Sequence, residues 1–432
     1  MAQHLSLSAQ RGILILAASL CAMLLSYFSI RNALAVHFAS SLTLQGMERA
    51  TRLEPGDARN WYQLGRYWQY DLEDSDVPRA IRAYLSALSF NPHSPETWLD
   101  LATAYESEGD LVAARDAFLH AKKTYPLSAE VSWRYGNFLL RQGELEPAFV
   151  EMRHAVEADP KRSAEAFSRA LRTEPDVEKI LDRVLPSKAE AYVDVVWDQT
   201  AEGNIDNALK AWDRLVPIHP RLPLNDSFAL VDGLINKKQI SVAQRVWDQA
   251  VGFAGLSDLQ GPPGSVLWDG GFESRVTGGG FSWRIPEYFS NPQVSFDAQE
   301  KHSGNRSLRL MFTGKSNLNF MDICHYVPVH PSSAYQFSAW VHTRSLTSDQ
   351  GVRFEVLSVG PQSTPPAVTP EVHGSEPWTR VEVPWSSGKD VQEAQVCIAR
   401  FPSDQPENRI QGTAWVDDVA LVPVSSPEHS QP

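Results

Sequence analysis

The sequence predicts a multidomain protein: an all-α solenoid followed by an all-β jelly-roll sandwich, preceded by one N-terminal transmembrane helix. Three observations lead to this prediction. Small, aromatic and proline residues recur every 34 positions between residues 80 and 160. Short alternating strands replace that helical pattern after residue 265. An uncharged, apolar run occupies residues 12–30.

Length and composition limit the classes of protein. A chain of 432 residues is too long for one ordinary hydrophobic core and suggests more than one domain. A hydrophobic content of 43% with 21% charged residues is typical of globular proteins. The net charge of −13 predicts that nucleic acid is not a partner, because phosphate binding needs a basic surface.

The apolar run follows a short N-terminal segment, residues 1–11. Its 19 residues, 12–30, are long enough to cross a bilayer as a signal anchor, and Arg11 and Arg31 flank it. Cleavage as a signal peptide after Ala33-Leu34-Ala35 is the alternative. The length of the run and the position of Arg31 favour the anchor, which makes the membrane a partner of residues 12–30.

The 34-residue period places equivalent residues in successive helical hairpins. Gly109, Ala114, Phe118, Ala121 and Pro126 recur as Gly143, Ala148, Met152, Ala155 and Pro160. Small residues let two helices approach, glycine allows the turn and proline stops the second helix. We expect an α-solenoid over residues 34–254, interrupted where Pro175 and Pro186 break the pattern of residues 163–185.

These positions resemble the tetratricopeptide repeat, whose first helix carries a Trp, Leu, Gly and Tyr pattern. Trp98, Leu101, Ala102 and Tyr105 follow that pattern, with alanine in place of glycine. The resemblance implies a groove for a protein or peptide partner. The repeat register places in this groove Tyr62, Arg66, Tyr70, Trp133, Asn137 and Arg141.

Three of these residues, Arg66, Asn137 and Arg141, could hold a peptide carboxylate, as in the similar clamp of chaperone-binding repeats. That clamp uses lysine and asparagine at set positions, which this sequence does not reproduce. A plain solvated groove is the alternative interpretation.

Residues 255–265 are rich in glycine and proline and are expected to form a linker. Beyond them, residues 266–424 contain alternating segments typical of an antiparallel sandwich. The expected strands are Ser307–Phe312, Asn319–Val329, Tyr335–Thr343, Val352–Val359, Thr379–Pro384, Ala394–Phe401 and Thr413–Val422. Residues 425–432 are expected to be a disordered tail.

The same region resembles carbohydrate-binding modules of the galactose-binding-like, jelly-roll type. The matching segments are residues 268–273 (WDGGFE), 302–310 (HSGNRSLRL), 327–341 (VPVHPSSAYQFSAWV) and 415–419 (WVDDV). The resemblance implies a polysaccharide ligand and no catalytic activity. The order of anchor, repeats and module is similar to that of bacterial envelope proteins. It implies a single-pass protein of the inner (cytoplasmic) membrane whose bulk faces the periplasm or exterior.

Strand alternation indicates which side chains could contact a sugar. In residues 335–342, Trp340 and His342 lie on the face opposite the apolar side chains. Arg353 and Glu355 of the next expected strand are assigned to the same side as Trp340. The alternative is that Trp340 packs under a loop or against the solenoid. Weaker candidates on expected loops are Trp283, Tyr288 and Trp378.

Asp417 shares strand parity with apolar Val419 and Leu421, so its carboxylate is expected to point inward and to need a partner. The resembling modules often bind a structural calcium here, which implies Glu273 and Asp417 as ligands. Asp418 replaces Asp417 if the parity shifts. A salt bridge to Arg309 or hydrogen bonds to the backbone are the alternatives.

The chain has three cysteines, Cys21, Cys324 and Cys397, and none forms a CxxC pair. An extracytoplasmic sandwich makes a disulfide between Cys324 and Cys397 an option, since both lie on expected strands. Two buried free thiols are the alternative.

Enzyme signatures such as HExxH, GxxxxGK[ST] and GxSxG do not occur in the sequence, and Gly278–Gly280 does not follow a strand and open a helix. We therefore expect a non-enzymatic, membrane-anchored adaptor whose repeats bind a protein and whose sandwich binds polysaccharide. The alternative is a structural assembly protein whose sandwich packs on protein and binds no sugar.

Overall fold

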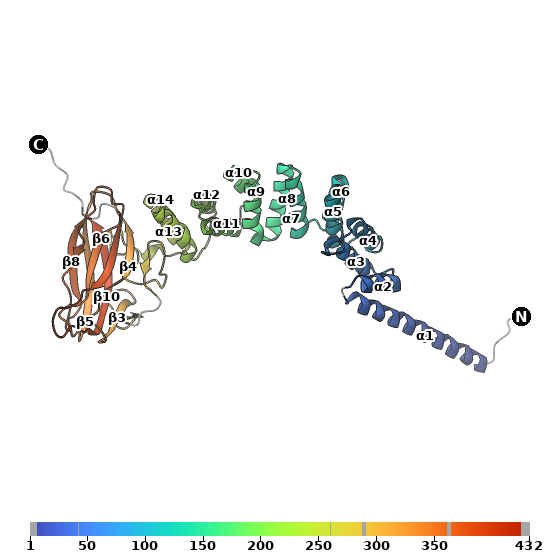
Figure 1. Ribbon diagram of the computed structural model, residues 1–432. Helices are drawn as coiled ribbons and strands as arrows, with labels where there is room; N and C mark the ends of the chain where they lie inside the picture. The colour runs from blue at the N-terminus through green and yellow to red at the C-terminus, as the bar shows by residue number, and fades with distance from the viewer. Residues whose placement is uncertain (1–6, 42, 260, 287–290, 361–363, 425–432) are drawn as a thin grey trace. The chain divides into compact units, whose positions relative to one another are not determined.

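The computed structural model of the chain describes residues 7–41, 43–259, 261–286, 291–360 and 364–424 (Figure 1). The expected tail, residues 425–432, lies outside the described residues, as do residues 1–6 and Tyr288. The chain divides into two compact units, Met1–Pro186 and Ser187–Pro432, and each is described by itself.

The described residues of the first unit form ten α-helices. They are α1 (Leu7–Ala39), α2 (Leu44–Leu53), α3 (Ala58–Tyr70), α4 (Val77–Phe90), α5 (Pro95–Glu108), α6 (Leu111–Thr124), α7 (Ala129–Arg141), α8 (Leu145–Ala158), α9 (Ser163–Leu171) and α10 (Val177–Arg183). Consecutive helices α3 and α4, α5 and α6, and α7 and α8 lie side by side as pairs (Figure 1). The break between α9 and α10 contains Pro175, as the sequence predicted.

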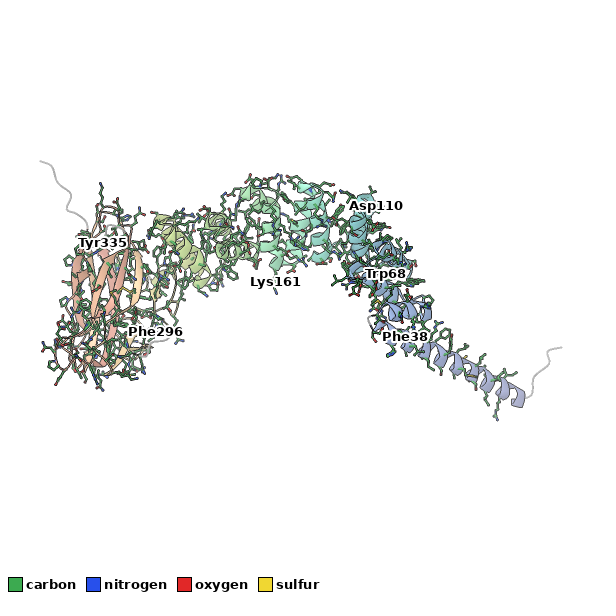
Figure 2. All side chains as sticks on the ribbon, in the orientation of Figure 1. Phe38, Trp68, Asp110, Lys161, Phe296 and Tyr335 are labelled. Carbon is green, nitrogen blue, oxygen red and sulfur yellow. A yellow bond between two sulfur atoms is a disulfide. The ribbon has the colours of Figure 1, made fainter. Side chains whose placement is uncertain are left out.

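The repeated residues explain these pairs. Ser94 and Ser128 cap α5 and α7 by accepting hydrogen bonds from backbone amides of the first turn. Gly109 and Gly143 follow α5 and α7 with φ of 81° and 76°, values that favour glycine. Small Ala80, Ala114 and Ala148 are fully buried where paired helices approach, and Trp68 of α3 is buried beside them (Figure 2). The 34-residue period therefore encodes the helical hairpins.

Helix α1 joins the apolar N-terminal run to the repeats. Its segment Arg11–Ala39 is long and apolar enough to cross a membrane. Near its C-terminal end, Ala35 and Ala39 are buried. Arg31 Nε donates a 2.9 Å hydrogen bond to Glu54, and Arg49 lies over the ring of Phe38 at 5.4 Å (Figure 2). The C-terminal end of the apolar helix α1 thus packs against α2, and the two form the first helical hairpin.

The second unit begins with four α-helices and continues as the sandwich. The helices are α11 (Ala189–Ala201), α12 (Ile205–Leu215), α13 (Phe228–Asn236) and α14 (Ile240–Phe253). The strands are β1 (Trp283–Arg284), β2 (Gln293–Asp297), β3 (Ser307–Thr313), β4 (Phe320–Pro328), β5 (Ala334–Arg344), β6 (Arg353–Ser358), β7 (Ala367–Val368), β8 (Thr379–Ser386), β9 (Glu393–Arg400) and β10 (Gln411–Pro423). The seven expected strands are found with ends within two residues of those predicted; short β1, β2 and β7 were not predicted.

The strands form two antiparallel sheets that pack face to face. The first has the order β1-β4-β9-β6-β7 and the second β2-β3-β10-β5-β8. Alternate side chains of both sheets form one core, which includes Tyr335, Phe337 and Phe354 (Figure 2). The described residues therefore contain the predicted α-solenoid elements followed by the predicted β-sandwich.

Helices α13 and α14 pack against the sandwich within the second unit. The ring of Trp247 on α14 meets Trp268 and Phe281 edge to face, at centroid distances of 5.4 and 6.1 Å. Asp232 of α13 accepts hydrogen bonds from Arg284 (2.7 Å) and from the amide of Gly280 (3.0 Å). The last helical hairpin therefore contacts the sandwich through both apolar and charged side chains. The contacting residues precede and follow the expected linker at residues 255–265 in the sequence.

Candidate functional site

A ladder of charged side chains runs between the first helices of three successive repeats. Arg66, Asp100 and Arg134 stand 34 positions apart, one on each of α3, α5 and α7. Arg134 Nη1 and Tyr62 Oη each donate a 2.9 Å hydrogen bond to the buried carboxylate of Asp100. Burial, together with this carboxylate, raises the pKa of Tyr62 to about 12. Arg66 lies farther away, with Nε 3.8 Å from Asp100.

The first cavity of this unit lies at one end of the ladder. It has a volume of about 620 Å³ and is lined by Tyr62, Arg66 and Tyr70, together with Met47, Arg59, Gln63, Tyr67 and Asp71. The guanidinium of Arg66 lies over the rings of Tyr62 and Tyr70, 6.0 and 5.6 Å from their centroids. Three of the six predicted groove residues therefore meet in one aromatic and basic cavity.

The other three predicted groove residues line a second cavity of about 250 Å³. Trp133, Asn137 and Arg141 share it with Thr103, Phe118, Arg134 and Arg169. Arg141 donates two hydrogen bonds to Glu106, at 2.7 and 2.8 Å. Asn137 donates to the carbonyl of Trp133 and accepts from Arg169, both at 2.8 Å. The polar groups expected to hold a peptide carboxylate at Asn137 and Arg141 are thus engaged within the chain.

On the sandwich, Trp340 lies on the outer face of the second sheet, as strand alternation predicted. The ring of His302 stacks on it at a centroid distance of 4.0 Å and an interplanar angle of 16°. His302 Nδ1 lies 2.6 Å from Oδ2 of Asp418, a contact that fixes the imidazole. Trp340 is therefore half-buried under the loop that carries His302, which is the alternative packing considered from the sequence.

His342 belongs to the same aromatic cluster. Its ring stacks on Trp415 at 5.0 Å and lies 5.7 Å from Trp378, while its Nδ1 lies 2.7 Å from the carbonyl of Glu376. Arg344 covers Trp415 at 4.9 Å. The sequence did not indicate His302 or Trp415 as site residues, because neither strand parity nor loop composition reveals which loop folds over a sheet.

Arg353 and Glu355 do not join this cluster, so that part of the prediction is wrong. They lie on β6, in the first sheet, whereas Trp340 lies on β5 in the second. Outward side chains of the two sheets point in opposite directions, because each inner face is in the core. Arg353 instead pairs with Glu371 (3.1 Å), and Glu355 is buried beside Cys397 of β9, its partner in the register.

The inward direction predicted for Asp417 is also wrong. The pairing of β10 with β5 shifts between Asp417 and Ala420, and Asp418 adopts φ of 45°. This bulge places Val416 and Val419 in the core and leaves Asp417 opposite Trp340, on the outer face. A bulge inserts a residue without changing composition, so alternation alone could not locate it.

Asp417 is nevertheless fully buried, because the loop after β2 covers it. Its Oδ2 accepts hydrogen bonds from the amides of His302 (2.8 Å) and Ser303 (3.1 Å). Glu273 Oε1 accepts from the amide of Asn305 (2.6 Å). The two carboxylates thus hold one loop by its backbone, which matches the alternative of hydrogen bonding to the backbone rather than a salt bridge to Arg309.

The carboxylates of Glu273, Asp417 and Asp418 are the groups that would bind a calcium ion. Burial, with the nearby charge of Asp418, raises the pKa of Asp417 to about 6. Asp417 Oδ1, Glu273 Cγ and Asp418 Oδ1 all lie within 4 Å of a Cβ built on Gly271. Within the described ranges, no three His, Cys, Asp or Glu side chains form a metal-binding group. These residues carry the carboxylate oxygens that Ca²⁺ prefers, but the oxygens already accept hydrogen bonds from backbone amides and side chains of the loop.

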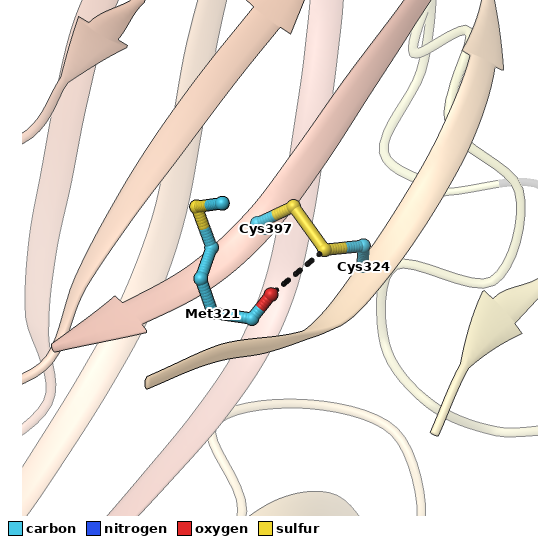
Figure 3. Close-up of a disulfide and its surroundings, with 3 residues drawn as sticks. All are labelled: Met321, Cys324 and Cys397. Carbon is cyan, nitrogen blue, oxygen red and sulfur yellow. Dashed lines mark hydrogen bonds between the residues drawn. A yellow bond between two sulfur atoms is a disulfide. The ribbon is translucent and has the colours of Figure 1, made fainter. Parts of the chain in front are cut away.

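Cys324 and Cys397 are joined by a disulfide (Figure 3). The two cysteines lie opposite each other in the register of β4 and β9, so the bond links neighbouring strands of the first sheet. Cys324 Sγ also lies 3.3 Å from the carbonyl of Met321 (Figure 3). Cys21 lies on α1, remote in sequence from both, and is free.

Comparisons with known proteins show similarity to two solved folds. YrrB, described as a TPR protein with an unusual peptide-binding site, aligns at 15% identity and a TM-score of 0.26, covering 50% of this chain and 96% of that one. A family 16 carbohydrate-binding module aligns at 16% identity and a TM-score of 0.25, covering 36% of this chain and 99% of that one. No family model and no curated protein matches the sequence.

The elements and their order define the class of protein. The described helices and sheets form a helical-repeat region followed by an antiparallel β-sandwich. The described residues therefore define a multidomain protein with an all-α solenoid and an all-β sandwich.

Proposed function

We propose that this protein is a non-enzymatic, membrane-anchored adaptor of a bacterial envelope. Helix α1 anchors it, the repeats bind a protein partner, and the sandwich binds polysaccharide. The observation that carries the proposal is the 620 Å³ cavity in which Tyr62, Arg66 and Tyr70 meet. Its volume lies in the range of roughly 300–1,000 Å³ usual for ligand pockets. Aromatic rings with arginine are the side chains enriched where proteins bind each other.

The polysaccharide part of the proposal is supported by the aromatic cluster on the second sheet. Trp340, Trp378 and Trp415 lie there together with two histidines. Indole rings combine an apolar face with a polar N–H, which suits a pyranose ring that has an apolar face and hydroxyl edges. His302 covers part of Trp340, so a sugar would displace it or stack on neighbouring rings.

The proposed location is the inner (cytoplasmic) membrane, crossed once, with the bulk of the chain in the periplasm or outside. The apolar helix near the N-terminus and the disulfide of the sandwich support this location, since disulfides persist in oxidising compartments. A membrane-impermeant thiol reagent applied to intact cells tests it, with Val112→Cys as the exposed target in a Cys21→Ala background. Labelling of position 112 without cell lysis supports the location, and labelling only after lysis contradicts it.

A structural calcium at Glu273 and Asp417 is proposed as the alternative to a corner held by backbone hydrogen bonds alone. The ion would neutralise neighbouring carboxylates and hold the loop of residues 302–305, without catalysis. A ligand that binds only the folded state raises the melting temperature. We expect CaCl₂ to raise the melting temperature of the full-length protein relative to EDTA, and Asp417→Asn with Glu273→Gln to remove that increase. An equal melting temperature in CaCl₂ and EDTA would show that the carboxylates serve only the backbone.

Site-specific photo-crosslinking tests the adaptor function. A benzophenone amino acid replaces Tyr70, which is half-exposed at the first cavity, or Val112, which is exposed on α6. We expect irradiation of cells to yield a discrete cross-linked protein from position 70 and none from position 112. Cross-linking from neither position, or equally from both, would count against a partner in the predicted groove.

A structural assembly protein that binds no sugar is the second candidate. The junction of α14 with the sandwich favours it, since Trp247 packs against Trp268 and Phe281 as in a permanent interface. Calorimetric titration of the full-length protein with cello-, manno-, xylo- and chito-hexaose separates the two. Binding of any hexaose that Trp340→Ala abolishes supports the adaptor, and no binding of all four supports the assembly role.

A further inference from the structure

The arginines of the inner helices differ in whether a carboxylate uses their hydrogen-bond donors. Arg134 donates to Asp100 (2.9 Å), Arg141 to Glu106 (2.7 Å) and Arg169 to Glu165 (2.7 Å). Arg162 likewise donates to Glu130 at 2.8 Å. The inner surface formed by α5, α7 and α9 is therefore largely neutralised within the chain.

Arg66 is the exception in this series. Its nearest carboxylate, Asp100, lies 3.8 Å away and already accepts hydrogen bonds from Tyr62 and Arg134. The side chain of Arg66 is 57% exposed. Tyr62 and Tyr70 flank the guanidinium, so its plane is supported while its N–H donors stay available. A guanidinium held in this way is suited to bidentate binding of a carboxylate.

The other charges of the first cavity strengthen this contrast. Arg59 is a second cation, 89% exposed, whose nearest carboxylate, Asp57, lies 3.7 Å away. The acid at the rim, Asp71, uses its Oδ1 to accept hydrogen bonds from the amides of Glu73 (3.0 Å) and Asp74 (2.8 Å). The cavity thus offers two cations with available donors, beside an acid that is occupied by its own turn.

We infer that the first cavity selects an acidic peptide segment in which Asp or Glu lies next to an aromatic or long aliphatic residue. The carboxylate pairs with Arg66, and the apolar side chain fills the space between Met47, Tyr67 and Tyr70. This inference rests on the proposed function of the repeats as a partner-binding surface. It adds the charge and residue types of the partner, and it assigns the 250 Å³ cavity no role in charge selection.

The test is selection from a random 12-residue peptide library displayed on phage, against the full-length protein in detergent micelles. We expect enrichment of peptides with Asp or Glu beside Phe, Tyr, Trp, Leu or Met. The best synthetic peptide should bind Arg66→Gln at least tenfold more weakly, about 1.4 kcal/mol. Arg52→Gln is the control, and we expect it to change the affinity less than twofold because Arg52 pairs with Glu48 on α2 and lines neither cavity.

The results distinguish failure of the inference alone from failure of the proposed function. Enrichment of basic or uncharged peptides that bind at Tyr70 would overturn the acidic preference and leave a partner groove in place. Unchanged affinity in Arg66→Gln would overturn the role of Arg66. Failure to enrich any peptide would overturn both. Weakening of binding between 50 and 300 mM NaCl is expected for an exposed charge pair and provides an independent readout.

Discussion

Arg134 donates a 2.9 Å hydrogen bond to Asp100, which stands 34 positions earlier at the equivalent place of the preceding repeat. The bond therefore links two neighbouring repeats through the same position on their first helices. Asp100 also accepts from Tyr62 of the repeat before it, so one carboxylate connects three helices. These two bonds occupy Asp100 and leave Arg66, 3.8 Å away, with available donors.

The first prediction concerns this carboxylate. Asp100→Asn removes the negative charge of the buried carboxylate to which Arg134 and Tyr62 donate hydrogen bonds. The guanidinium of Arg134 then loses its carboxylate partner. We expect a loss of about 2–3 kcal/mol in the free energy of unfolding, measured by urea denaturation of the full-length protein in micelles. Glu165→Gln removes an exposed partner of Arg169 and should cost less than about 0.5 kcal/mol. Equal losses in both variants would contradict the role of Asp100.

The second prediction concerns pH. Burial raises the pKa of Asp269 to about 7, well above its ordinary value. The folded state therefore binds a proton that the unfolded state has already released, and stability falls as pH rises from about 4 to 7. His325, fully buried with a pKa lowered to about 4, acts in the opposite direction below about 6.5. Between pH 7 and 6.5, Asp269 therefore dominates.

We expect the free energy of unfolding of the second unit to increase on acidification from pH 7.5 to 6.5, by roughly 0.3–0.5 kcal/mol, because His325 offsets about half of the contribution of Asp269. Asp269→Asn should remove this increase, because its amide does not titrate. Urea denaturation followed by tryptophan fluorescence at the two pH values measures it. A wild-type stability that falls over this interval would show that Asp269 is not the controlling group.

The third prediction concerns the disulfide. Cys324 and Cys397 are 73 positions apart, so their bond restricts a long loop of the unfolded chain. We expect the double variant Cys324→Ala, Cys397→Ala to lose about 2–4 kcal/mol of stability, measured by denaturation under non-reducing conditions. Cys21→Ala is the control and should leave stability unchanged, since this thiol is free. Wild-type protein that is equally stable with and without reductant would contradict the prediction.

The sequence predicted the repeats well because their signal is local and redundant. Each hairpin carries its own alanines, glycine and proline, so a change at Ala102 does not hide the 34-residue period. The strands were located by alternation for the same reason. The site on the sandwich was predicted only in part, because it depends on two non-local features. These are the bulge at Asp417 and Asp418 and the loop that places His302 on Trp340.

Which of the two sheets a strand joins also depends on residues far away in the sequence. Consecutive strands β5 and β6 belong to different sheets, so Arg353 cannot be assigned to the side of Trp340 by sequence order. The junction of α14 with the sandwich was also not predicted. Its glycines, Gly279 and Gly280, were visible in the sequence, but their partners Phe228 and Trp247 lie about 50 and 30 residues away.

The fourth prediction concerns that junction. A Cβ on Gly280 would lie 2.5 Å from the ring of Trp247, so Gly280→Ala must displace α14 or the loop. We expect a loss of about 1–3 kcal/mol from the clash and the positive φ of 55°. Gly374→Ala is the control, since its φ of 69° is also left-handed and no atom lies within 4 Å of the added Cβ.

Differential scanning calorimetry of the full-length protein distinguishes the two variants. Gly374→Ala reports the backbone strain alone, and Gly280→Ala adds the contact with Trp247. A larger decrease in the melting temperature for Gly280→Ala supports the junction. An equal decrease in the two variants would mean that α14 does not hold its position against the sandwich.

The last prediction concerns His302 and Trp340. The imidazole occupies the face of the indole at 4.0 Å, and Asp418 fixes it through Nδ1. A pyranose that stacks on Trp340 must therefore displace His302 and lose that hydrogen bond. We expect His302→Ala to bind the hexaoses of the titration panel at least threefold more tightly than wild type. The double variant His302→Ala, Trp340→Ala should bind no better than Trp340→Ala alone, because the indole provides the stacking surface.

The control is His373→Ala, which removes an exposed histidine of the same sandwich. Weaker binding by His302→Ala would mean that His302 contacts the sugar directly rather than covering its site.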